Sequence, residues 1–196
     1  MIECPYCQNL LKEASSECPQ CHIDIEKLAR LMGPMPAIFG GVSQNGARLS
    51  TREVKRLTKV TEKFQRRFPQ SRLHLLCRSF SQEMDFKVIL FWLFNKGGLS
   101  NQGNRGGKNR DIVLLIEPTR GKAGVIVGYG LEPLLSQETL DRVVLSAEEK
   151  LKNGEFAAAF ETMVDEITKE LREICAALPE AVGLQARSLK NKTPSY

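Results

Sequence analysis

Two cysteine pairs near the N-terminus constrain the fold of this chain more than any other feature. Cys4 and Cys7 form one CxxC pair, and Cys18 and Cys21 form a second pair after ten intervening residues. A two-residue gap lets both sulfurs of one tight turn reach the same ion, and four thiolates in a tetrahedron are a ligand set of structural zinc sites. The spacing therefore predicts one structural Zn²⁺ held by these four cysteines, with no coordination position open to a substrate.

Two other interpretations of the cysteines are weaker. A disulfide framework is typical of secreted chains, and the sequence begins without the basic segment and apolar core of a signal peptide. A redox CxxC normally follows a strand in a βαβ unit, whereas mostly polar residues separate these pairs. The longest apolar run, from Val88 to Phe94, is far shorter than the ~20 residues that span a bilayer. We therefore expect a reduced, cytoplasmic protein without a membrane span, in which His22 is a surface histidine rather than a metal ligand.

The segment from Met1 to His22 resembles the short zinc ribbons that begin many intracellular bacterial proteins, in which two CPxC knuckles face each other across a small hairpin. These ribbons usually carry glycine after the second cysteine of each knuckle, where this chain has Gln8 and His22. A segment this short buries too little apolar surface to fold alone, so metal binding would supply most of its folding free energy.

Composition divides the chain into four parts. Residues 1–32 are assigned to the ribbon and a short helix capped by Asp24. Residues 33–49 are rich in glycine and proline and are assigned to a linker that tethers the ribbon without building it into the main core. Residues 50–178 form the predicted α/β domain, and residues 179–196 form a basic tail that we expect to be disordered.

A strongly two-faced helix is predicted at the start of the α/β domain. Ser50 and Glu53 match a capping box, and apolar residues recur at helical spacing as far as Phe68. We expect the opposite side to be a solvated face, and the alternative is weak, sequence-independent binding of nucleic acid or another polyanion. The formal net charge of +5 does not distinguish the solvated face from polyanion binding, because four thiolates and one zinc ion reduce this charge to about +3. Seven cations lie on that side: Arg52, Lys55, Arg56, Lys59, Lys63, Arg66 and Arg67.

The pattern after this helix alternates between strands and helices. Strands are predicted at residues 72–77, 111–116 and 123–127, and the last two are joined by a short turn and should therefore be antiparallel. Helices are predicted at residues 84–96, 137–151 and 155–176. The expected fold is α/β, a three-layer α/β/α domain with a small mixed β-sheet, preceded by the zinc ribbon.

Two short motifs stand in this region: Gly128, Tyr129, Gly130, Leu131 and Glu132 follow the predicted hairpin, and Gly154 to Ala158 precede the last predicted helix. With these motifs the sequence resembles the TPM domain family over residues 50–178. Glycine on both sides of Tyr129 allows a sharp exit from the strand or a positive φ, and we expect the Tyr129 ring to pack under the turn. Some members of this family are described as metal-binding phosphatases and others as partner-binding factors, so the resemblance implies both functions.

A catalytic role would depend on a glycine-rich loop and on nearby acids. The loop spans residues 97–108 and contains Arg105 and Lys108, which are candidates for anion binding. Asp111 and Glu132 are the candidate catalytic residues. Glu138 and Asp141 have two interpretations: they join these residues as oxygen ligands of a Ca²⁺ or Mg²⁺ ion, or they form the acidic first turn of a helix. His74 falls inside a predicted strand, so no pair of a nucleophile and a histidine is expected.

These observations rank three functions. The first is a binding or regulatory adaptor module that recognises a protein partner, with protein maintenance as the role that the family resemblance implies. The alternative is a divalent-metal-dependent phosphatase, and nucleic-acid binding through the basic helix face comes third. An adaptor should expose an apolar patch, a phosphatase should gather carboxylates beside the glycine-rich loop, and a nucleic-acid-binding protein should carry a continuous basic surface.

Overall fold

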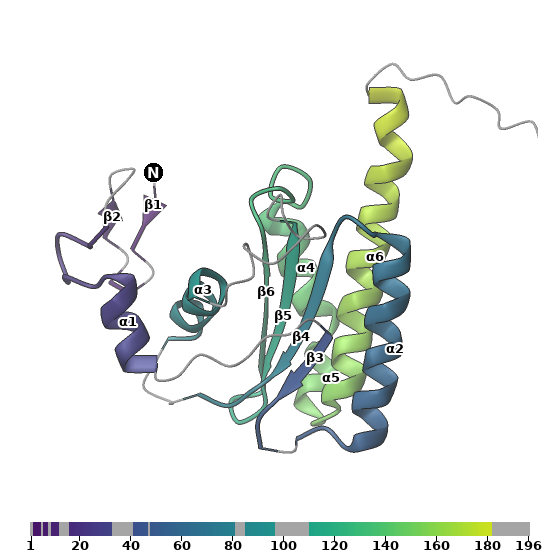
Figure 1. Ribbon diagram of the computed structural model, residues 1–196, viewed down its shortest axis with the longest axis horizontal. Helices are drawn as coiled ribbons and strands as arrows, with labels where there is room; N and C mark the ends of the chain where they lie inside the picture. The colour runs from purple at the N-terminus through teal and green to yellow at the C-terminus, as the bar shows by residue number, and fades with distance from the viewer. Residues whose placement is uncertain are drawn as a thin grey trace, which may run out of the picture.

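A four-stranded mixed sheet forms the centre of the protein (Figure 1). The computed structural model describes residues 2–4, 6–7, 9–11, 16–32, 41–46, 48–80, 85–96 and 110–181. The strands are β3 (Gly41–Gln44), β4 (Arg72–Cys77), β5 (Asp111–Glu117) and β6 (Lys122–Val127), and they lie side by side in that order. β4 is parallel to both β3 and β5, and β6 is antiparallel to β5. The predicted mixed sheet and its antiparallel hairpin are confirmed.

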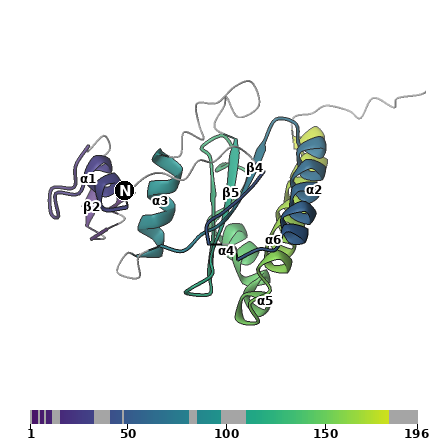
Figure 2. The same ribbon diagram turned by 60° about the horizontal axis from the view of Figure 1, so that its bottom comes forward.

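The strand β5 is buried along its whole length. Its side chains alternate between two hydrophobic cores, with Ile112 and Leu114 in one core and Val113 and Leu115 in the other. A strand that is buried on both faces needs a layer of helices on each side of the sheet. The sheet is covered in this way, which confirms the three-layer α/β/α prediction (Figure 2).

One face of the sheet carries the helices that begin and end the α/β domain (Figure 2). α2 (Thr51–Arg67) packs beside α6 (Phe156–Ala181), and α4 (Gln137–Ser146) and α5 (Glu148–Lys152) also contact α6. Leu57 of α2 and Phe160 of α6 are fully buried in the shared core. The capping box at the start of α2 is confirmed, because Glu53 N donates to Ser50 Oγ at 3.3 Å and Ser50 N donates to Glu53 Oε2 at 2.8 Å.

The opposite face is covered by α3 (Phe86–Lys96). Trp92 of α3 is 1 % exposed and shares a core with Val113 of β5. α3 also passes very close to β6 at Gly124, where an added Cβ would lie 2.5 Å from Leu90 Cδ1 and 2.8 Å from Phe86 Cε1. Glycine at this position therefore lets α3 lie against the sheet.

The N-terminal segment packs on the outer side of α3 (Figure 1). β1 (Ile2–Glu3) and β2 (Leu10–Leu11) form a separate antiparallel pair, and α1 (Ile25–Met32) follows the second cysteine pair. Asp24 caps α1 as predicted, since Lys27 N donates to Asp24 Oδ1 at 2.6 Å. Leu28 of α1 is 2 % exposed and belongs to the same core as Trp92. α1 is therefore built into the core of the α/β domain, and the tethering of the cysteine-bearing ribbon before it stays a prediction.

The predicted linker also contains a strand. Residues 41–44, which fell within the predicted linker 33–49, form β3, and this edge strand pairs Gly41 with His74 and Gln44 with Cys77. The sequence of β3, Gly-Val-Ser-Gln, has one apolar side chain in four residues and therefore no alternation of apolar and polar positions that would predict a strand. Residues 33–40 lie outside the described part of the chain.

Two helix boundaries differ from the prediction as well. The helix expected at residues 137–151 is interrupted at Ala147, which separates α4 from α5. α6 continues to Ala181, so residues 179–181 belong to the helix rather than to the predicted tail. The remaining tail residues, 182–196, lie outside the described residues. Among the helices that the structure describes, none is long and apolar enough to cross a membrane.

The close contact at Gly124 leads to a stability prediction. Gly124→Val should lower the free energy of unfolding by about 1–3 kcal/mol, because the new methyl groups collide with the Leu90 and Phe86 side chains of α3 and disturb their packing. Chemical denaturation measures this change. The matched control is Leu90→Ala combined with Gly124→Val, in which the removed leucine atoms leave room for the valine, so the double variant should lose less than the sum of the single variants. Additive losses would contradict this explanation.

Candidate functional site

The four N-terminal cysteines converge on one point. Their Sγ atoms all lie within 4.8 Å of one another. The Cys4 and Cys21 sulfurs are 3.8 Å apart, and the Cys7 and Cys18 sulfurs are 3.6 Å apart. A tetrahedral zinc ion with bonds of about 2.3 Å separates its sulfur ligands by about 3.8 Å, whereas a disulfide requires about 2.05 Å. The arrangement therefore fits a tetrahedral metal ion such as zinc.

Backbone hydrogen bonds hold the two knuckles in place. Cys4 N donates to Asn9 O at 2.8 Å in the first knuckle, and Cys18 N donates to Ile23 O at 3.0 Å in the second. His22 N donates to Cys18 O at 2.9 Å, and His22 has a φ of 55°, the left-handed conformation that favours glycine at this place in a knuckle. The His22 side chain is exposed and its Nδ1 lies 3.0 Å from Glu17 Oε1, so His22 is a surface residue, and it is not among the four clustered ligands.

The cysteines differ in how readily they lose a proton. Hydrogen bonds from the Cys21 backbone lower the pKa of the Cys18 thiol to about 6, whereas burial raises the pKa of the Cys21 thiol to about 12. Four thiolates at such short distances repel one another, so the cluster cannot carry four negative charges by itself. A divalent cation would offset this repulsion and allow all four sulfurs to ionise.

The candidate catalytic residue Asp111 lies at the buried start of β5. Its Oδ1 is 3.1 Å from Nε2 of His74 on β4, and both side chains are almost completely buried. Asp111 Oδ2 and His74 Nδ1 have no hydrogen-bond partner among the described residues. The pair joins the two central strands inside the protein. The sequence did not predict this contact, because a histidine within a strand pattern gave no sign of its partner.

The other candidate acids do not gather around Asp111. Glu132, Glu138 and Asp141 are all exposed, and Glu138 lies in the first turn of α4, where the helix dipole favours an acid. In the described part of the chain, the four cysteines form the only cluster of three or more potential metal ligands. The glycine-rich loop, with Arg105 and Lys108, lies outside the described residues.

The Gly-Tyr-Gly motif forms a tight turn directly after β6. Gly128 N donates to Asp111 O at 2.9 Å, and Leu131 N donates to Gly128 O at 2.7 Å. Leu131 and Leu135 are buried beneath the turn, whereas Tyr129 is 69 % exposed and Leu134 is 40 % exposed. The expectation that the Tyr129 ring packs under the turn is therefore wrong, since leucines fill that space. Gly128 and Gly130 also do not have the positive φ that the sequence allowed.

The seven cations of α2 are all exposed, as expected for a solvated helix face. Arg56 pairs with Glu161 of α6 through Nε and Oε1 at 2.6 Å, which ties the two helices together. The sequence indicated the basic face of α2, but it gave no sign that cations of α6 lie beside that face.

The fold and the cysteine cluster define a class of protein: an α/β domain with a mixed four-stranded sheet and an N-terminal segment in which four cysteines converge. The family model for the TPM domain matches residues 42–170, which is more than half of the chain, and the chain therefore belongs to the TPM domain family. The start of the match at residue 42 agrees with β3 being part of the domain.

The fold also resembles a solved structure. The BA42 protein of the psychrophilic bacterium Bizionia argentinensis is similar with a TM-score of 0.56 and 11 % identity, over 64 % of this chain and 83 % of that one. The N-terminal domain of the cg2496 protein of Corynebacterium glutamicum aligns with a TM-score of 0.49 and 11 % identity, over 85 % of this chain and 97 % of that one. At 11 % identity the likeness to the BA42 protein shows the fold alone. No curated protein gives a significant match.

The cysteine geometry predicts one zinc ion per chain. Elemental analysis of protein purified under reducing conditions without chelators should find this ratio. The variant Cys4→Ser with Cys18→Ser should contain no zinc, whereas Cys175→Ser, which removes an exposed cysteine outside the cluster, should keep one ion per chain. A metal-free wild-type protein under these conditions would show that the cluster is not a zinc site.

Metal removal should also disturb the contact between α1 and α3. Trp92 is the only tryptophan, and it shares its core with Leu28 of α1, which follows the cysteines closely in the chain. Chelation should therefore shift Trp92 fluorescence to longer wavelength, with full recovery when zinc is restored. An unchanged emission spectrum would mean that α1 stays packed without the metal.

The buried pair of Asp111 and His74 predicts a structural effect of mutation. Asp111→Ala should lower the free energy of unfolding by about 2–5 kcal/mol, because it leaves a buried imidazole without its partner. Asp141→Ala removes an exposed carboxylate and should cost less than about 1 kcal/mol. Equal losses in the two variants, measured by chemical denaturation, would contradict the proposed importance of the pair.

Proposed function

We propose that this TPM-domain protein is a binding module that recognises a protein partner through the turn after β6. The observation that carries the proposal is the exposure of Tyr129 and Leu134 on a turn whose base is fixed by buried Leu131 and Leu135. An aromatic and an aliphatic side chain on a rigid base lose little conformational entropy on binding, and such residues dominate the energy of protein interfaces.

The zinc ribbon has a structural role in this proposal. Four thiolates leave no open position on zinc, so the metal would hold the N-terminal segment in shape rather than act on a substrate. Because α1 packs on α3, the ribbon would also support one of the two helical layers. The metal thus stabilises the module from a site away from the Tyr129 turn.

A divalent-metal-dependent phosphatase is the alternative function. It would need several oxygen ligands around a Ca²⁺ or Mg²⁺ ion and a water aimed at phosphorus. Asp111 instead contacts His74 in the interior, and Glu132, Glu138 and Asp141 do not join it in a cluster among the residues that the structure describes. These positions favour the binding module.

A pull-down with matched variants tests the binding proposal. Tagged wild-type protein and the Tyr129→Ala, Leu134→Ala variant are used as bait, and captured proteins are identified by mass spectrometry. The control bait is Tyr6→Ala with Leu145→Ala, which removes the same two residue types from other exposed positions. We expect one partner to bind the wild type and the control, and to bind the turn variant at least about 30-fold more weakly, as for a loss of 2 kcal/mol or more.

A phosphatase assay with the same preparations distinguishes the alternative. We expect no metal-dependent hydrolysis of a phosphomonoester in the presence of Mg²⁺, Ca²⁺ or Mn²⁺. Hydrolysis by the wild type that Asp111→Asn abolishes without changing the melting temperature would establish the phosphatase. A partner that binds all three baits equally would instead show that binding does not use the Tyr129 turn.

A further inference from the structure

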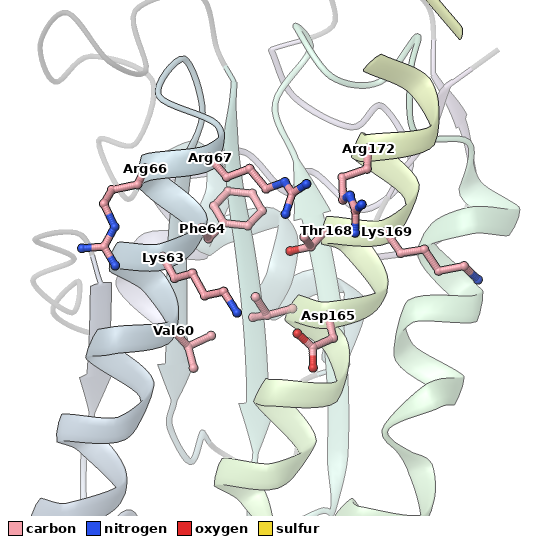
Figure 3. Close-up of a pocket in the computed structure, with 10 residues that line it drawn as sticks. Val60, Lys63, Phe64, Arg66, Arg67, Asp165, Thr168, Lys169 and Arg172 are labelled. Carbon is pink, nitrogen blue, oxygen red and sulfur yellow. The ribbon is translucent and has the colours of Figure 1, made fainter. Parts of the chain in front are cut away.

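A groove lies between the C-terminal part of α2 and the middle of α6 (Figure 3). Its volume is about 540 Å³, which is within the range of pockets that hold small molecules. Phe64 of α2 contributes to the apolar part of its lining, and Asp165 and Thr168 of α6 contribute polar groups. The groove is therefore large enough for a small organic ligand and has both apolar and polar walls.

Three cations from the two helices point into this groove. Figure 3 shows Lys63 and Arg67 of α2 reaching toward α6, and Arg172 of α6 turning back toward them. Lys63 and Arg67 are one helical turn apart, which places both on the side of α2 that faces α6. Arg66 and Lys169 also line the groove, but their charged ends point outward in Figure 3.

The positive charge in the groove is not balanced by the surrounding protein. Lys63, Arg67 and Arg172 form no ion pair with any residue that the structure describes. Closer to the start of α2, by contrast, Arg56 is neutralised by Glu161. Asp165 is the single acid in the groove lining, so three converging cations face one carboxylate. Their mutual repulsion is unfavourable in the free protein, and a bound anion would relieve it.

We propose that this groove binds a small soluble ligand that carries a phosphate monoester or a diphosphate group. Lys63, Arg67 and Arg172 would hold the phosphate oxygens, and the apolar wall at Phe64 would contact the rest of the ligand. Asp165 repels a phosphate, but its carboxylate suits a hydroxyl or amino group elsewhere on the same molecule. The site is independent of the Tyr129 turn and of the protein partner proposed above.

The arrangement favours such a ligand over a nucleic-acid strand. Internal phosphates of nucleic acids carry one negative charge each, whereas a terminal phosphate or a diphosphate concentrates two or more charges at one place. Three cations that point at the same space match a concentrated charge. A polymer would instead draw on the exposed cations outside the groove, such as Arg52, Lys55 and Lys59.

Isothermal titration with inorganic pyrophosphate tests the site in the zinc-loaded chain of 196 residues. Lys63→Gln with Arg67→Gln should weaken binding at least about tenfold, because two charge-assisted contacts are lost. The control is Lys59→Gln with Arg52→Gln, which removes the same two residue types from the same helix outside the groove and should change affinity less than about threefold. The groove variant should melt no lower than the wild type, since it removes unbalanced like charges.

A second pair of variants tests the groove through a gain of affinity. Asp165→Asn removes the acid that repels the phosphate and should tighten pyrophosphate binding at least about threefold. Glu62→Gln makes the same change of net charge at an exposed position of α2 outside the groove and should have little effect. This comparison remains valid even if the double cation variant folds poorly.

Three outcomes would overturn the proposal. The first is that pyrophosphate does not bind the wild type at millimolar concentration. The second is that the groove and control variants lose affinity equally, which would indicate a diffuse effect of surface charge. The third is that a single-stranded DNA oligonucleotide binds more tightly than pyrophosphate and is weakened equally by both cation variants, which would assign the basic face of α2 to a polymer.

Discussion

The burial of β5 on both faces is the constraint on which the rest of the structure depends. All seven residues of this strand are removed from solvent, so the sheet must be covered twice. The polar residues at its two ends must then find partners inside the protein. Asp111 at the start contacts His74, and at the other end Arg120 N donates to Glu117 Oε2 at 2.7 Å within the hairpin turn. The strand is thus apolar along its length and anchored by a carboxylate at each end.

The two covering layers are built differently. On one face α2 and α6 bury large side chains and are joined at the surface by Arg56 and Glu161. On the other face α3 lies on the sheet through the space that Gly124 leaves, and α1 extends the layer outward from the cysteine cluster. A metal ion in that cluster would therefore act on the core indirectly, through the packing of Leu28 against α3.

Features that depend on neighbours in the chain could be predicted from the sequence. The apolar run of β5, the capping box of Ser50 and Glu53, and the spacing of the cysteines each have a local physical cause, and the structure shows each of them. Features that depend on distant contacts could not be predicted. The four residues of β3 have no strand pattern and pair with β4, and Leu28 is buried in a core that it shares with α3. Tyr129 is exposed because Leu131 and Leu135 occupy the space beneath the turn, which composition does not reveal.

The packing of α2 against α6 brings together two helices that the ribosome makes at different times. Roughly a hundred residues separate Arg56 from Glu161, so at synthesis rates of about 5–20 residues per second α6 follows α2 by about 5–20 s. During that interval Leu57 and Phe64 lack the helix that completes their core, although the segments that form α2 and the first strands have already been synthesised. The nascent protein therefore carries an apolar stripe along α2 until its final long helix emerges, and the mutual repulsion of the exposed α2 cations favours the solubility of the unfinished chain.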